Sequence, residues 1–190
     1  PPHGRPPSKK RIWEDLDMTR ATLAAALAAA LSASAAMAAE AGSDAEIARG
    51  KYLVGIMDCS ACHTPGSFLG KPDFDRYLAG SDVGFAVPGL GYFWGANLTP
   101  DEATGIGSWS KDEIVTALRT GVRPDGRQLA PAMPWISYAS LTDEDAYAVA
   151  AFLKTLPPIR NDAEIAPVGW DQTPAAPYQP VVFPEVAAAP

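Results

Sequence analysis

The sequence predicts a mainly α-helical domain followed by a Pro-rich extended tail. Three segments each join an N-terminal capping residue to apolar side chains at helical spacing. The long stretch between the first two has neither a helical nor a strand period, and the chain holds 16 Gly and 19 Pro residues, which favours long loops. With 190 residues, the chain suits one modest domain plus extensions.

Two N-terminal segments are expected to lie outside this domain. Residues 1–17 are Pro-rich and charged and do not begin with methionine, so we interpret them as a leader, either an artificial remnant or an over-extended translation start. Residues 18–38 join a short positive start to an Ala/Leu run that ends in Ala36-Met37-Ala38, the pattern of a cleaved signal peptide. A retained membrane anchor is the alternative, but the run is only weakly hydrophobic. The folded domain is therefore predicted over residues 39–158.

The first predicted helix spans residues 44–58, and either Ser43 or Asp44 can cap its start. Its apolar face is formed by Ile47, Gly50, Val54 and Met57. A glycine inside a helix costs about 1 kcal/mol relative to alanine. Gly50 is therefore expected to pack closely against another element, the alternative being a glycine that the helix merely tolerates.

The next segment, Cys59-Ser60-Ala61-Cys62-His63, has the spacing of a covalent haem attachment site. On a turn of helix, Cys59 and Cys62 can each bond one vinyl group of the same porphyrin. The adjacent His63 then lies under the ring, where its imidazole can be the proximal ligand of the iron. The motif therefore predicts one covalently bound haem c.

Other interpretations of the two cysteines are weaker. A structural zinc site needs four Cys or His ligands, and the only other histidine is His3, in the leader. A thioredoxin-like dithiol requires a strand before the motif, and no β-branched run precedes it. A chance match in a structural segment is the remaining alternative. Both cysteines lie in the motif, so no other pair is present to form a structural disulfide.

Residues 64–100 are predicted to form a long irregular segment, because they contain seven Gly and four Pro residues without sustained periodicity. Loops of that length are uncommon unless they are functional, and a flat cofactor with two faces to cover would explain one. Several aromatic residues in this segment can form an apolar wall, although each is as well explained as an ordinary core residue: Phe85, Tyr92, Phe93 and Trp94.

Two further helices are predicted. The first starts at a capping box of Ser110 and Glu113 and ends at Gly121, with Ile114, Val115 and Leu118 on its apolar face. Pro124-Asp125-Gly126 then forms a turn. The last helix spans residues 143–156 after the capping residue Thr142. Its buried face comprises Val149, Phe152, Leu153 and Leu156.

Between these two helices lies an apolar loop, residues 129–135, that contains Met133. A lone methionine is usually a core residue. Given a haem, however, the domain has one histidine, already used, and Met57 lies on the proximal side of the ring, two residues before Cys59. Met133 is therefore the predicted distal iron ligand, the alternative being an open or weakly ligated sixth position.

The order of these elements resembles class I cytochrome c. The shared features are a capped helix, CSACH, a Gly-rich stretch, GANLTPDEATGIGSWS, a helix, a PAMPW loop and a C-terminal helix. The chain is most similar to cytochrome c domains in multihaem electron-acceptor subunits of periplasmic alcohol, gluconate and sugar dehydrogenases. The resemblance covers roughly residues 44–158, whereas those subunits usually carry several such domains.

The resemblance implies a small class I cytochrome c fold wrapped round one covalently bound haem, in which the Gly50 helix crosses the Phe152 helix. It implies Cys59 and Cys62 as thioether anchors, His63 as the proximal ligand and Met133 as the distal ligand. Trp109 is a candidate partner of a haem propionate, as a tryptophan is in some relatives.

Further side chains and backbone groups are candidates for the surroundings of the haem. Asn97, Arg119 and Arg123 are candidate propionate partners, with an ordinary surface role as the alternative for each. A backbone carbonyl, for which Pro88 is a candidate, is expected to hold the His63 ring nitrogen that faces away from the iron.

The tail, residues 159–190, is Pro-rich with few charges and spaced aromatic residues. It is predicted to be extended chain, either disordered or lying along the domain or a partner subunit.

The functional prediction is single-electron transfer by a periplasmic monohaem cytochrome that is not itself an enzyme. Its expected partners are redox proteins: a dehydrogenase, an oxidase or another cytochrome. The formal net charge of −7 favours basic or neutral docking surfaces and does not support nucleic-acid binding. Membrane contact is expected only through a partner complex or an uncleaved leader. The alternatives are a haem enzyme or small-ligand sensor with a labile sixth position, and a fixed subunit of a larger complex.

Overall fold

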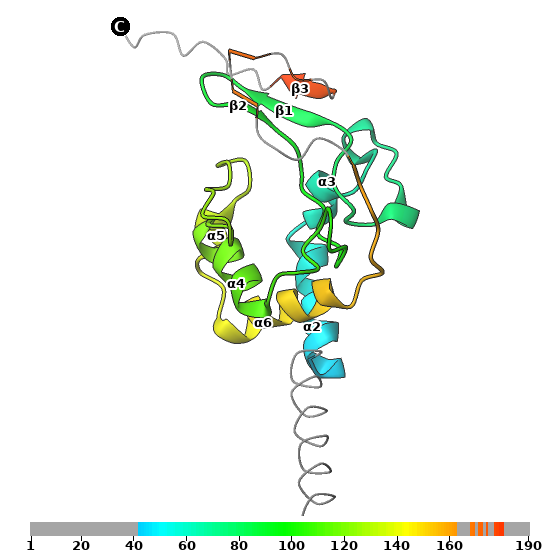
Figure 1. Cartoon of the computed structure of the whole chain (residues 1–190). Coiled ribbons are helices and arrows are strands. Elements are labelled where there is room, and N and C mark those ends of the chain that lie inside the picture. The colour runs from blue at the N-terminus through cyan, green and yellow to red at the C-terminus, as the bar shows by residue number, and fades with distance from the viewer. Residues whose placement is uncertain (1–41, 163–167, 170, 173, 175–176, 181–190) are drawn as a thin grey trace, which may run out of the picture. The chain divides into compact units, whose positions relative to one another are not determined.

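The computed structural model describes residues 42–162, 168–169, 171–172, 174 and 177–180 (Figure 1). The predicted leader and signal peptide, residues 1–17 and 18–38, lie outside the described residues. Within the described part of the chain, none of the helices has both the length and the apolar character that a membrane crossing requires.

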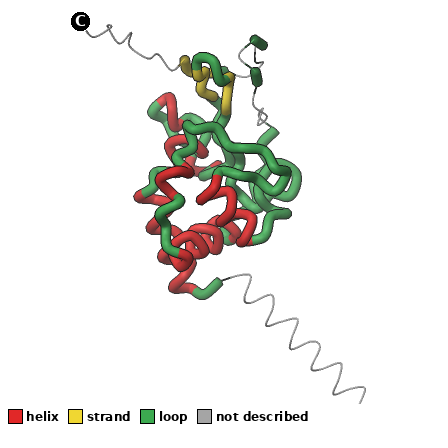
Figure 2. The backbone as a smooth tube through the Cα atoms, turned by 90° about the vertical axis from the view of Figure 1, so that its left-hand side faces the viewer, coloured by secondary structure: helices red, strands yellow, loops and turns green. Residues whose placement is uncertain are grey.

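The described unit consists mainly of helices and loops, which confirms the mainly α prediction. The α-helices are α2 (Asp44–Ile56), α3 (Cys59–His63), α4 (Lys111–Thr120), α5 (Trp135–Tyr138) and α6 (Asp143–Lys154). Two 3₁₀ helices follow α3, η1 (Ser67–Leu69) and η2 (Phe74–Arg76). The strands are β1 (Gly84–Val87), β2 (Gly91–Phe93) and β3 (Tyr178–Pro180). Figures 1 and 2 show the strands at one end of this unit and the longer helices toward the other.

Helices α2 and α6 cross in close contact, and the crossing depends on Gly50. A Cβ atom built on Gly50 would lie only 2.8 Å from the Phe152 Cβ atom and would also collide with the Ala148 carbonyl. Beside the crossing, the Arg49 Nε atom pairs with an Asp145 carboxylate oxygen at 2.8 Å. The close-packing interpretation of Gly50 is therefore confirmed, and so is the predicted crossing with the Phe152 helix.

The helix ends follow the capping signals in the sequence. Ser43 and Glu46 form a capping box at the start of α2, and Ser110 and Glu113 form one at the start of α4. Gly121 ends α4 with a φ of 71°, a left-handed conformation that glycine adopts without a Cβ penalty. These local hydrogen bonds explain why the predicted boundaries agree with the observed ones to within about two residues.

The buried core joins α2, α4 and α6 to two loop residues. Its large apolar members are Leu53, Val54, Leu78, Ile106, Ile114, Val115, Leu118, Val149, Phe152 and Leu153. Ile106 comes from the loop before α4, and Leu78 comes from the loop after η2. The core therefore fixes these two loops as well as the helices.

The segment 64–100 is more ordered than the sequence predicted, because it contains the antiparallel β1–β2 hairpin. Phe85 pairs with Phe93, and Ala86 pairs with Tyr92. The connecting turn is closed by the Leu90 amide, which donates to the Val87 carbonyl at 3.0 Å. It has proline and then glycine at its central positions, with Gly89 at a φ of 75°. Strands of three or four residues are too short to give a readable alternation, so the periodicity analysis missed them.

Val168 and residues 177–180 of the tail lie along this hairpin. Strand β3 pairs in parallel with β1, placing Tyr178 beside Gly84 (Figure 1). The Trp94 indole Nε1–H donates to the Pro177 carbonyl at 2.9 Å. Tyr92 contributes a backbone bridge to Val168 and an edge-on ring contact with Tyr178 at 4.7 Å between centroids. Of the two alternatives for the tail, these residues therefore support packing along the domain.

The helix crossing yields a prediction about stability. Gly50→Ala should lower the free energy of unfolding by about 1–3 kcal/mol, because the added methyl group overpacks the crossing. Gly55→Ala is the matched control: it lies in the same helix, and its added Cβ would meet nothing within 4 Å. It should leave stability unchanged or raise it by up to about 1 kcal/mol. Guanidinium denaturation followed by circular dichroism measures both changes, and equal effects would contradict the account of the crossing.

The tail contacts yield a second prediction. Trp94→Phe removes the hydrogen bond to Pro177 and should speed chymotryptic cleavage after Tyr178 about fivefold, since a hydrogen bond contributes about 1 kcal/mol net. Trp135→Phe is the control, because the buried Trp135 indole N–H has no hydrogen-bond partner among the described residues. Rapid cleavage of the unmodified protein, at the rate of the Trp94 variant, would show that the tail does not dock.

Candidate functional site

A cavity of about 590 Å³ lies inside the described unit, within the roughly 300–1,000 Å³ typical of ligand sites. Its walls come from α3, α4 and α6, from the loops around residues 93–109 and 127–134, and from Phe85 of β1. Apolar side chains predominate among them, including Phe93, Trp94, Leu98, Ile106, Ile114, Leu118, Leu129, Val149 and Leu153. The cavity therefore suits a large apolar group.

The two cysteines enter this cavity from α3. Asp58, the residue before the helix, has a φ of 54°, and this left-handed residue separates α3 from the end of α2. Cys59 and Cys62 are partly buried free thiols, and both line the cavity. Burial raises the pKa of Cys59 to about 11 and also raises the pKa of Cys62. The motif thus places two protonated thiols in the cavity lining.

His63 is the most constrained member of the motif. Its side chain is buried, and its Nδ1 atom lies 2.7 Å from the Ala96 carbonyl oxygen. Because a carbonyl only accepts, Nδ1 carries the proton and Nε2 keeps its lone pair. Burial lowers the pKa of His63, although the Ala96 contact opposes this effect, so the imidazole is neutral at pH 7. A neutral ring with one nitrogen held by a carbonyl is the usual state of a metal-binding histidine.

The carbonyl that holds His63 belongs to Ala96 and not to Pro88, so the residue named from the sequence was wrong although the kind of contact was right. Pro88 lies in the exposed turn of the hairpin. Ala96 reaches the ring because the adjacent Gly95 packs directly on the motif: its added Cβ would collide with the Cys62 carbonyl group. Only a glycine at position 95 permits this approach.

Met133 also lines the cavity, from the loop after α4. It is partly buried and packs against the core. The loop is held locally by two backbone bonds, from the Met133 amide to Ala130 at 3.0 Å and from the Trp135 amide to Met133 at 2.8 Å. Met57 lines the same cavity from the end of α2, next to the motif. Two thioether groups therefore line the cavity: Met57, just before the motif, and Met133, in the loop after α4.

Two arginines supply positive charge to the largely apolar wall. Arg123 and Arg127 flank the predicted turn, and the Arg123 amide donates to the Arg127 carbonyl at 3.0 Å. The Arg123 guanidinium lies over the ring of Trp109, 5.3 Å from its centroid, and pairs with Asp125 at 3.2 Å. The buried Arg123 Nε atom has no hydrogen-bond partner among the described residues. Arg127 was missed from the sequence, where only the turn between the two arginines hinted at their proximity.

Two other predicted propionate partners, Arg119 and Asn97, already form hydrogen bonds with other protein groups. Arg119 does not line the cavity; it bonds the Asp143 carboxylate at 2.7 Å and the Leu141 carbonyl, which is the ordinary ion-pair alternative. Asn97 lines the cavity but its amide is fully used. Both of its N–H groups donate, to Thr104 and to the Ile159 carbonyl, and its oxygen accepts from Thr99. Asn97 is therefore not retained as a propionate partner.

These residues fit a covalently attached haem. The buried Arg123 Nε atom is an orphaned donor in the cavity wall, and an acidic group of a ligand would satisfy it. Two adjacent thiols, a neutral histidine and thioether sulfur match the donors that proteins offer to haem. No group of three or more His, Cys, Asp or Glu side chains arranged to hold a bare metal ion occurs among the described residues.

Comparison with known proteins points in the same direction. The family model described as Cytochrome c matches residues 47–157. The chain is 41% identical over 110 residues to the fructose dehydrogenase cytochrome subunit of Gluconobacter japonicus, covering 57% of this chain and 21% of that protein. It is 36% identical over 156 residues to the gluconate 2-dehydrogenase cytochrome c subunit of Pantoea cypripedii, covering 80% and 33%.

A third relative is the cytochrome c subunit of the quinone alcohol dehydrogenase of Gluconobacter oxydans (strain 621H). It is 33% identical over 149 residues, which cover 78% of this chain and 29% of that subunit. The matched region thus spans only about a fifth to a third of the length of these three curated relatives.

Proposed function

The chain belongs to the cytochrome c family, and on that premise we propose that it transfers single electrons through one haem. In this proposal Cys59 and Cys62 form the thioether bonds, and His63 and Met133 are the two iron ligands. One haem is proposed because the chain contains one CSACH motif and no further cysteine. The cytochrome c domain itself implies a covalently bound haem c.

The observation that carries this proposal is the state of His63. It is buried, neutral and held at Nδ1 by the Ala96 carbonyl, in a cavity that both cysteines share. A merely structural histidine would not need two thiols beside it. The contact to Ala96 leaves Nε2 as the nitrogen available to the iron.

The chain's own residues would set the environment of the redox centre. Haem supplies reversible one-electron chemistry at its iron, and ligation by histidine and methionine raises the reduction potential. The apolar side chains of α4 and α6 exclude water from the cavity, while Arg123 and Arg127 provide charge for acidic substituents. None of these residues is proposed to act on a substrate, so the chain is proposed as an electron carrier and not as an enzyme.

The partner proposed for the chain is a dehydrogenase, for which it would act as the electron-transfer subunit. This proposal is supported by the names of the relatives, which include cytochrome subunits of fructose, gluconate and alcohol dehydrogenases. We place the protein in the periplasm, because the predicted signal peptide over residues 18–38 would export it. Its net charge of −7 favours a basic or neutral docking surface.

The proposed iron ligation is tested by replacing Met133. The unmodified oxidised protein should show the near-infrared thioether-to-iron band, and its reduced form should bind carbon monoxide slowly. Met133→Ala should lose the band and bind carbon monoxide rapidly, because the sixth position becomes open. Met57→Leu is the matched control, since it removes the other thioether from the cavity and should keep the band. A missing band and rapid carbon monoxide binding in the unmodified protein would instead favour a haem enzyme or small-ligand sensor.

The proposed partner is tested by purification from the native cell under mild conditions. A dehydrogenase should accompany the cytochrome, and the amount recovered should fall as salt is raised, because charge complementarity is screened. Recovery of the native protein only as a monomer in the periplasmic fraction would contradict the subunit proposal and leave the free carrier.

A further inference from the structure

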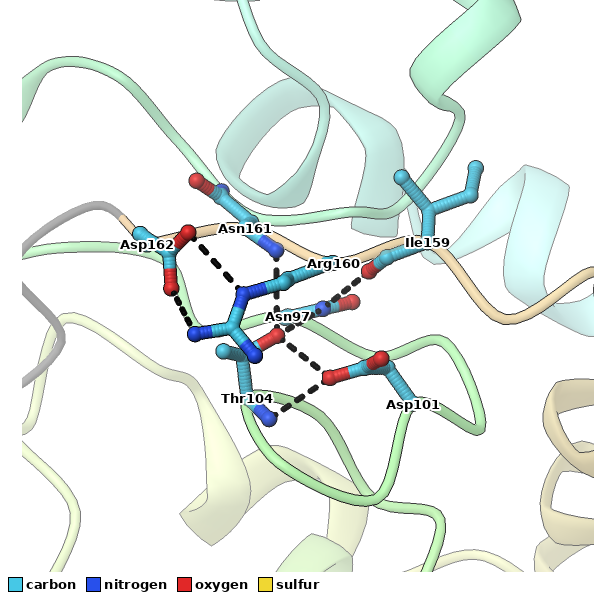
Figure 3. Close-up of polar contacts among 7 residues, drawn as sticks. All are labelled: Asn97, Asp101, Thr104, Ile159, Arg160, Asn161 and Asp162. Atoms are coloured by element: carbon cyan, nitrogen blue, oxygen red, sulfur yellow. Dashed lines mark hydrogen bonds and ion pairs between the residues drawn. The ribbon is translucent and has the colours of Figure 1, made fainter.

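We propose that Asn97 and Asn161 are positioning residues for His63, through a partly buried hydrogen-bond network that ties the segment after α6 to the proximal side of the site. Figure 3 shows the part of this network around Asn97, Thr104, Ile159 and Asn161. The network reaches His63 by two routes. One route acts on the imidazole ring through the Ala96 carbonyl. The other acts on the His63 backbone through the loop at Ala79 and Gly80. This inference rests on the proposed role of His63 as an iron ligand.

The first route starts at Asn97, which follows Ala96 directly in the chain. The Asn97 Nδ2 atom donates to the Ile159 carbonyl at 2.7 Å and to the Thr104 hydroxyl at 3.1 Å (Figure 3). Its Oδ1 atom accepts from the Thr99 amide at 2.9 Å and from the Thr99 hydroxyl at 2.7 Å. With all four contacts made, the backbone at Asn97 has little freedom, and the peptide unit that carries the Ala96 carbonyl is held with it.

The second route starts at Asn161. The side-chain Nδ2 atom of Asn161 donates to the Ala79 carbonyl at 2.6 Å, and the backbone N–H of Asn161 donates to the Thr104 hydroxyl at 3.0 Å. The neighbouring Gly80 amide donates to the His63 carbonyl at 2.8 Å. Gly80 has a φ of 101°, and a Cβ atom there would lie 2.7 Å from the Asn161 Nδ2 atom. The motif backbone is therefore held through the same segment that holds Asn97.

The two routes are cross-linked into one layer of chain segments. The Leu98 amide donates to the Leu78 carbonyl, and the Ser81 amide donates to the Gly95 carbonyl, each at 2.8 Å. The Ile159 amide closes the layer by donating to the Thr99 hydroxyl at 3.1 Å.

Burial makes this network strong enough to position the ring. Asn97 is 1% exposed and Thr99 is fully buried, so water cannot replace a lost partner. The role proposed for Asn97 is thus positional, in place of the propionate contact expected from the sequence.

The consequence for function follows from the bond that the network holds. A hydrogen bond from Nδ1–H to a carbonyl makes the imidazole a better electron donor, which stabilises the oxidised protein. Loosening the Ala96 carbonyl should therefore favour the reduced form. The network sets the reduction potential as well as contributing to stability, and these two effects are separable by experiment.

The experiment measures the haem-loaded Asn97→Ala variant by redox titration and by exchange of the His63 Nδ1 proton in NMR spectra of the reduced protein. The equilibrium constant for reduction should rise by up to about tenfold, equal to about 59 mV for one electron. Proton exchange should accelerate about tenfold, because the bond opens more often. Thr99→Val removes the network hydroxyl at nearly constant volume and should shift both readouts in the same direction. It serves as the test if Asn97→Ala fails to fold.

Two controls separate positioning from stability. Thr99→Ser keeps the hydroxyl and should restore both readouts to those of the unmodified protein. Ser43→Ala removes the α2 cap and should lower stability without changing either readout. Unchanged potential and exchange in both the Asn97 and Thr99→Val variants would overturn this inference alone. A haem-loaded protein without histidine ligation, before any substitution, would overturn the proposed function and this inference with it.

Discussion

The hydrogen bond between the His63 ring and the Ala96 carbonyl is the interaction on which the site depends. It joins α3, which carries the cysteines, to the chain segment that enters the cavity from the β1–β2 hairpin. At 2.7 Å and with the side chain buried, it fixes the tautomer and the orientation of the imidazole together. Several features that look unrelated in the sequence serve this contact, including Gly95 against the motif and Gly80 on the His63 carbonyl.

The helices provide the rigid frame around this contact. The close crossing of α2 and α6 at Gly50 fixes the start of the motif relative to the C-terminal helix, and α4 packs its apolar face against the same core. Side chains of α4 and α6 line the cavity together with those of the loop 93–98. Close packing resists small displacements, so a wall held in this way maintains a dry, shaped cavity. The formal net charge of −7 favours a docking partner of opposite or neutral charge.

The sequence predicted well those features whose cause is local. The capping signal at Ser43 or Asp44, the capping box at Ser110 and the left-handed Gly121 identified helix ends, because each involves residues within four positions of one another. The motif is local in the same way, and Cys59, Cys62 and His63 line one cavity. Other contacts join residues that lie 33 to 94 positions apart. They are the hydrogen bond between His63 and Ala96, the hydrogen bond from Asn97 to Ile159, and the pairing of β3 with β1. No local pattern encodes such contacts, because they arise only when the core brings the segments together.

We propose that this chain carries one haem bonded to both cysteines of the CSACH motif. The most direct test is the intact mass of the exported protein, measured before and after treatment with a thiol-alkylating reagent. The account predicts the mass of the mature polypeptide plus a single haem, unchanged by the reagent, because Cys59 and Cys62 are already in thioether bonds. A mass equal to the polypeptide alone, increased by two alkyl groups, would contradict it.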